Sequence, residues 1–120
     1  MLFFGTAVVC VTLGMFWGIQ MAASSNHLMA PAHAHLNLVG WVTMGLFGVY
    51  YHLVPEAAAR GLAKIHYVLA LGGVVAMVPG IAIALSGGGE TFAILGSILT
   101  ALSMLVFLFT VLREARSAAA

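Results

Sequence analysis

Four apolar runs, each about 20 residues long, constrain what this sequence can fold into. The runs cover residues 2–22, 34–54, 65–85 and 91–112. A helix of about 20 residues crosses the roughly 30 Å hydrocarbon core of a bilayer, and none of the runs alternates like a barrel strand. We therefore expect an all-α fold, an integral membrane four-helix bundle that forms one domain over residues 1–120.

Charged residues are too few to cover a water-soluble particle of this size. The chain has four Lys or Arg and three Asp or Glu, and hydrophobic types make up 63% of its residues, against roughly 45–50% in soluble domains. Such a composition excludes a disordered segment, and a net charge of +1 offers no basic face to a nucleic acid. The partner that remains is the lipid bilayer.

The four cations give the predicted bundle a direction. Arg60 and Lys64 lie in the predicted polar connection 56–64, and Arg113 and Arg116 lie near the end of the chain. Four crossings place these residues and the N-terminus on one face of the membrane. The positive-inside rule then predicts that both termini are cytoplasmic. We expect a multi-pass protein of a bacterial-type inner (plasma) membrane.

Histidine is the polar residue type that stands out. His27, His33 and His35 fall at the predicted extracytoplasmic boundary of the first two helices, where a polar side chain marks a candidate functional position. Neutral imidazole is the commonest metal ligand and a standard axial ligand of haem iron. We therefore interpret these three residues as candidate metal and cofactor ligands. Hydrated interfacial histidines are the alternative.

Spacing relates the candidate ligands to one another. In a helix, His33 and His35 project about 200° apart, so only one of them faces a given neighbour. Asn37 follows His33 by four residues, lies on the same helix face and is positioned to orient the His33 ring by a hydrogen bond. We include Asn37 among the cofactor-binding candidates.

Two further histidines lie at the opposite end of the predicted bundle. His52 and His66 flank the polar connection and neighbour tyrosines, which is typical of an interfacial aromatic belt. We interpret both as interfacial anchors, with a second metal site or a proton pathway as the alternative. On the first run, Gly14 and Gly18 form a Gly-x-x-x-Gly pattern that predicts close helix packing, or close approach of a flat cofactor.

The second apolar run carries a family resemblance. Residues 33–56 read HAHLNLVGWVTMGLFGVYYHLVPE. This segment resembles the second transmembrane helix of the catalytic subunit of haem-copper oxidases, nearest the nitric oxide reductase branch. That helix runs from a His through an Asn, a Trp and small residues to a Tyr-Tyr…Pro-Glu ending. The first run is similar to the family's first helix, and the match covers a little under half of the chain.

The resemblance implies a cofactor and a role. In that family, the His at the extracytoplasmic start of this helix is an axial ligand of the low-spin haem. The resemblance therefore implies a small b-type haem protein in which His33 or His35 is one axial ligand. The second axial ligand would be His27 or a histidine of another copy of the chain. Electron transport with a redox partner, or binding of a diatomic gas, is the implied function.

The chain departs from a full catalytic subunit. It has far fewer helices, its third run holds only His66, its fourth run holds no histidine, and no carboxylate lies within a run. We therefore identify no catalytic residue. Activity as an oxidoreductase of the cytochrome oxidase type would require an oligomer, and a homotrimer would approach the helix count of a full subunit.

Two alternatives to the haem protein stay open. The first is a copper-binding membrane protein that uses His27, His33 and His35 as a three-imidazole site. The second is a structural or assembly subunit whose histidines hold no metal. An absorption spectrum of the purified protein distinguishes the three.

Overall fold

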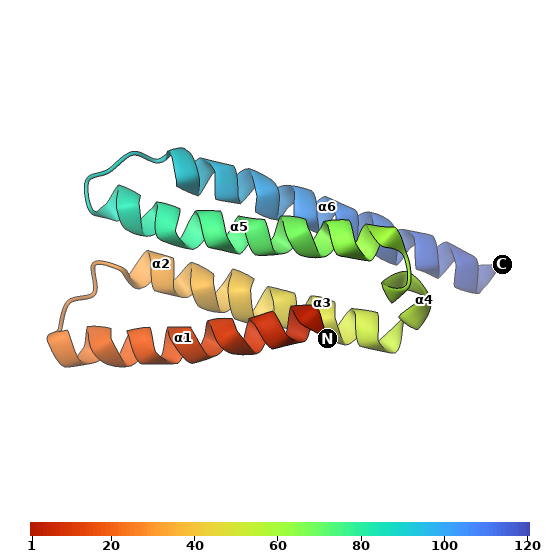
Figure 1. Ribbon diagram of the computed structural model, residues 1–120, viewed down its shortest axis with the longest axis horizontal. Helices are drawn as coiled ribbons and strands as arrows, with labels where there is room; N and C mark the ends of the chain where they lie inside the picture. The colour runs from red at the N-terminus through yellow and green to blue at the C-terminus, as the bar shows by residue number, and fades with distance from the viewer.

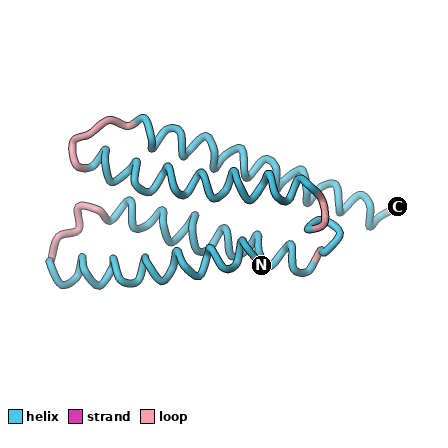
Figure 2. Tube along the Cα trace, viewed as in Figure 1, coloured by secondary structure: helices cyan, strands magenta, loops and turns pink.

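The chain is helical almost throughout. The computed structural model describes residues 1–120, of which 88% lie in helices and none in strands (Figure 2). The helices are α1 (Leu2–Ser24), α2 (Ala30–His35), η1 (Leu36–Thr43), α3 (Met44–Leu53), α4 (Pro55–Ala58), α5 (Gly61–Leu85) and α6 (Thr91–Ala119). The predicted all-α fold is confirmed.

The helices form two antiparallel hairpins that lie side by side (Figure 1). In one, α1 packs against the run of α2, η1 and α3, and in the other α5 packs along α6. The N-terminus, α4 and the C-terminus lie at one end, which we call the inner end. The loops 25–29 and 86–90 lie at the other, the outer end.

Three of these helices, α1, α5 and α6, are long and apolar enough to cross a bilayer, with mean hydropathies of 2.0, 2.4 and 2.4. Large apolar side chains point outward from them, and Phe16 and Val68 are 69% and 67% exposed. A water-soluble monomer rarely exposes so much contiguous apolar surface, whereas lipid chains solvate it. The prediction of a multi-pass membrane protein in contact with the bilayer is confirmed.

The second predicted span is a composite helix. It begins at Ala30, four residues before the predicted start, because Pro31 suits the first turn of a helix. Its middle part, η1, is a π-helix, and the Thr43 hydroxyl donates a hydrogen bond to the Leu38 carbonyl five residues back. The helix ends at Leu53, before Pro55. No sequence pattern predicted the π segment.

Other boundaries also differ from the sequence-based ones. The predicted connection 56–64 contains the short helix α4, which starts at a proline. Helix α5 begins at Gly61 rather than at residue 65, and α6 continues to Ala119 instead of ending at 112. The extension of α6 follows from its sequence, because no proline or glycine comes after Leu112 to end the helix.

Glycines hold each hairpin closed. In the second hairpin, atoms of one helix lie where a Cβ on a glycine of the other would be. Gly80 faces the main chain of Ala93, Gly96 that of Met77, and Gly73 the hydroxyl of Thr100. In the first hairpin, Gly14 and Gly18 accommodate side chains of the composite helix. The prediction that these two glycines allow close helix packing is confirmed.

Substituting Gly96 by Ala should destabilise the protein by about 1–3 kcal/mol, because the new methyl group must displace the main chain of Met77. Gly5→Ala is the matched control, because no atom lies within 4 Å of a Cβ at that position. Alanine also favours a helix over glycine by up to about 1 kcal/mol. The midpoint of SDS-induced loss of helicity measures the stability of both variants. Equal midpoints for Gly96→Ala and Gly5→Ala would contradict the close packing of Gly96 against Met77.

Candidate functional site

His33 lies against α1. Its Nε2 donates a hydrogen bond to the main-chain oxygen of Gly14 across 2.9 Å, which fixes the proton on that nitrogen because a carbonyl only accepts. A Cβ on Gly18 would lie 3.2 Å from the same nitrogen, so the two glycines create the space that the ring occupies. The imidazole of His33 therefore holds the two helices together at the outer end.

Asn37 supports this contact. Its side-chain Nδ2 donates to the His33 main-chain oxygen at 2.9 Å and lies 3.2 Å from His33 Nε2. A Cβ at Gly14 would overlap the Asn37 amide. The two residues are neighbours, as predicted. With the proton on Nε2, however, the Asn37 amide cannot donate to that ring nitrogen, and its hydrogen bond goes to the His33 main-chain oxygen.

His35 has a different arrangement. Its Nδ1 donates a hydrogen bond of 2.7 Å to the main-chain oxygen of Pro31, one turn earlier on the same helix. The proton is therefore on Nδ1, and the lone pair is on Nε2, which no other group of the chain contacts by a hydrogen bond. Metal-ligating histidines usually have this arrangement, with one nitrogen donating to a carbonyl and the other free for the metal. The ring is half-buried, so Nε2 is not enclosed by the bundle.

His27 is exposed in the loop between α1 and α2. The structure contains no group of three or more His, Cys, Asp or Glu side chains that could hold a metal ion. His27, His33 and His35 are therefore not brought together within one chain. A three-imidazole copper site built from these residues would need a rearrangement or a second copy.

An open groove of about 470 Å³ runs beside His33 on the outer surface. Its lining comes from α1 and the composite helix and consists of Gly14, Met15, Gly18, Ile19, Ala22, His33 and Asn37. The small residues of α1 leave space in this groove, because they carry little or no side chain. Of the three outer-end histidines only His33 lines this groove, so a flat group or a helix can approach His33 there.

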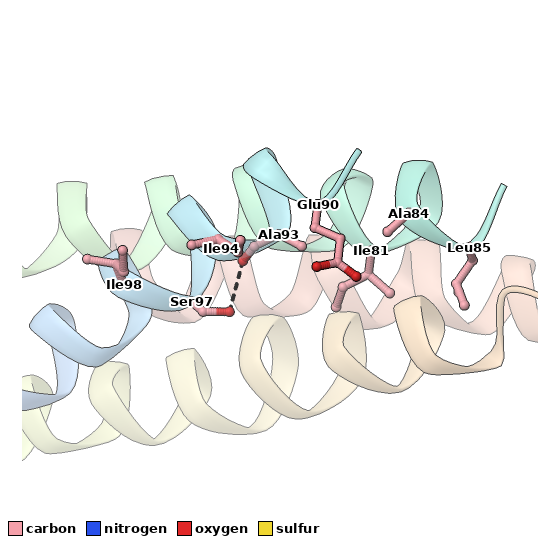
Figure 3. A pocket seen from close by; sticks show the side chains of 8 residues that line it. All are labelled: Ile81, Ala84, Leu85, Glu90, Ala93, Ile94, Ser97 and Ile98. Carbon is pink, nitrogen blue, oxygen red and sulfur yellow. Dashed lines mark hydrogen bonds between the residues drawn. The ribbon is translucent and has the colours of Figure 1, made fainter. Parts of the chain in front are cut away.

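A second groove, of about 490 Å³, lies between α5 and α6 near the outer end. Figure 3 shows the Glu90 side chain among apolar residues, and the Ser97 hydroxyl donating to the Ala93 main-chain oxygen. No histidine lines this groove. It is therefore separate from the histidine site.

At the inner end, the structure corrects the interpretation of His66. This residue is 0% exposed, and rings from three other helices surround it: Phe3, Phe47 and Phe107, with centroids 4.8, 4.4 and 5.6 Å from the imidazole. It is a core residue and not an interfacial anchor. His52, in contrast, is exposed, as an anchor would be.

One hydrogen bond ties the buried imidazole to the composite helix. The Tyr51 hydroxyl lies 3.0 Å from His66 Nδ1, while His66 Nε2 has no hydrogen-bond partner. Nearby, the Thr6 and Tyr67 hydroxyls share a bond of 2.8 Å, and Arg60 forms an ion pair with Glu114 at 3.0 Å. These contacts connect α1, α3, α5 and α6 and give the inner end a structural role.

Comparison of the chain with protein-family models, with curated proteins and with solved structures finds no match in any of the three. None of the three supports the resemblance to haem-copper oxidases, which rests on the residues of the first two predicted spans alone. The structure adds the hydrogen bonds of His33 and His35 at the outer end.

Replacing Tyr51 by Phe should lower the free energy of unfolding by about 1–3 kcal/mol, because His66 would then have no partner for either ring nitrogen. Tyr67→Phe is the matched control, since Tyr67 is only half-buried and its partner Thr6 is also partly accessible. SDS titration followed by circular dichroism measures the two losses. If Tyr51→Phe lost as little stability as Tyr67→Phe, or less, the hydrogen bond between Tyr51 and His66 would not be a main source of stability at the inner end.

Proposed function

We propose that this protein is a small b-type haem protein of the membrane, related to the catalytic subunits of haem-copper oxidases, with His35 as an axial ligand. The observation that supports His35 is its hydrogen bond from Nδ1 to Pro31 O, which leaves the Nε2 lone pair free. Haem iron would supply a one-electron couple for electron transfer and, with one coordination position open, a site for a diatomic gas.

The other outer-end residues have positioning roles in this proposal. His33 donates its Nε2 proton to Gly14, so in this arrangement its lone pair is on Nδ1, the ring nitrogen nearer its own main chain, and not on the outer Nε2. His33 instead fixes the composite helix against α1, and Asn37 supports it. We therefore assign the ligand to His35 rather than to His33, because the free lone pair of His35 is on the outer ring nitrogen, Nε2. The resemblance alone leaves this choice open.

The second axial position needs another imidazole or stays open. His27 is exposed in the adjacent loop, and a loop residue can move toward a ligand more easily than a helix residue. A histidine of a second copy is the other source. A trimer would bring together twelve spans if all four helical runs cross the membrane, as we propose.

The proposed orientation follows from charge. Arg60, Lys64, Arg113 and Arg116 belong to the inner end, whereas the two outer-end loops contain no cation. The positive-inside rule then puts both termini in the cytoplasm of a bacterial-type cell. The three outer-end histidines would face the other side of the membrane, where a redox partner would have to dock.

The purified protein should show a Soret band and dithionite-sensitive α and β bands. His35→Ala should lose most of this absorbance because it removes the free Nε2. His33→Ala should keep the bands while losing stability, because it removes only the contact with Gly14. Absorption spectra of protein expressed with added haem measure both effects.

His52→Ala is the matched control, because His52 is exposed at the other end of the same composite helix. Its spectrum should equal that of the unmodified protein. Retention of the bands in His35→Ala, or their loss only in His33→Ala, would contradict the ligand assignment. A colourless protein with stoichiometric copper would support the copper alternative, and a protein with neither would support a structural subunit.

The oligomer can be tested independently of the cofactor. We expect a mass of three chains for the protein in mild detergent, measured by light scattering with correction for bound detergent. A monomeric mass would exclude a partner histidine and leave His27 as the source of the second ligand. In that event His27→Ala should change the spectrum from six-coordinate to five-coordinate.

A further inference from the structure

The inner end carries a surface that the proposed haem site does not use. Near the C-terminus of α6, Phe109, Leu112, Arg113, Arg116 and Ser117 line an open groove of about 390 Å³, which we call the basic groove. Its residues are spaced by three, four, seven and eight positions from Phe109, so they occupy one face of the helix. Phe109 and Leu112 line the part of the groove nearer the membrane core, and the guanidinium groups of Arg113 and Arg116 line the part nearer the C-terminus.

The length of α6 sets the level in the membrane at which the basic groove lies. Helix α6 has 29 residues, which corresponds to about 43 Å, against a hydrocarbon core of roughly 30 Å. Its last turns project beyond the other helices at the inner end (Figure 1). The apolar run ends at Leu112, so Arg113 and Arg116 fall at the depth of the lipid headgroups, while Phe109 and Leu112 fall at the depth of the upper acyl chains.

Charge is divided between two faces of α6 at this level. Glu114 points toward the bundle, is 13% exposed and pairs with Arg60. This is the only ion pair in the chain. Arg113 and Arg116 are exposed and have no carboxylate partner, so the basic groove has two uncompensated positive charges.

We infer that the basic groove binds an anionic phospholipid, with the phosphate between Arg113 and Arg116 and one acyl chain along Phe109 and Leu112. Guanidinium groups bind phosphate oxygens with directional, charge-assisted hydrogen bonds. The apolar half of the groove selects a lipid over a soluble phosphate, because the two parts lie at the depths of a headgroup and its chains. The inference does not depend on which way the protein faces.

The test uses the full-length protein in a neutral detergent. Native mass spectrometry and the thermal midpoint are recorded during titration with phosphatidylglycerol or with zwitterionic phosphatidylcholine. We expect one tightly bound phosphatidylglycerol per chain and a higher midpoint, with clearly weaker binding of phosphatidylcholine. Arg113→Gln and Arg116→Gln should each weaken phosphatidylglycerol binding about fivefold, which corresponds to one basic residue near a membrane surface.

Lys64→Gln is the matched control, because it removes one exposed cation at the same end but outside the groove. It should leave the affinity unchanged. Equal weakening by Lys64→Gln would show a general charge effect and overturn the inference. Equal binding of the two lipids would overturn it as well, and so would the same midpoint shift with glycerol phosphate alone. Circular dichroism checks that each variant folds, and Arg116→Gln, four residues from the C-terminus, keeps the test available if Arg113→Gln does not.

Discussion

Close contact between helix backbones is the interaction on which the rest of this structure depends. Lipid chains are as apolar as leucine, so burying leucine between helices gives little advantage in a membrane, and association depends on packing. Here Gly80 and Gly96 let α5 and α6 approach until the main chain of one helix fills the space of a missing side chain of the other, and Gly73 makes room for the Thr100 hydroxyl. The second hairpin is thereby held together by backbone packing.

The same constraint explains the π segment. The residues of the composite helix that face α1 are His33, Asn37, Gly40, Gly45 and Gly48. They are spaced by four, three, five and three positions, and the step of five falls across η1 (Leu36–Thr43). A regular α-helix would turn Gly45 and Gly48 away from α1. One extra residue in the π turn keeps both the histidine end and the glycine end of the helix against the same neighbour.

The sequence predicted the features that follow from hydrophobic length and local spacing. The membrane-spanning helices, the contact of Asn37 with His33, and the packing role of Gly14 and Gly18 are of this kind. The π segment was not predictable, because a step of five resembles any irregular pattern until the partner helix is known.

His66 was misinterpreted because its neighbours in sequence, a tyrosine and a basic loop, are those of an interfacial residue. A signal was present in its helix, however. Ala70, Gly73, Met77 and Gly80 follow His66 at alternating steps of four and three, which is the spacing of one buried helix face. If alanine and glycine are counted as buried positions together with the large apolar residues, this pattern predicts that His66 lies in the core.

The two ends of the bundle differ in a way that suits a ligand at one end. At the inner end, four helices meet around His66, whose surroundings are aromatic rings and one tyrosine hydroxyl. At the outer end, His33 lines an open groove and His27 lies in an exposed loop. The inner end encloses the His66 imidazole and leaves His52 as the only histidine exposed on its surface. At the outer end, His35 donates from Nδ1 to a main-chain oxygen and keeps its Nε2 lone pair free. In the proposed function the inner end would fix the helices, so a cofactor at the outer end would meet a largely preformed site and lose little conformational entropy on binding.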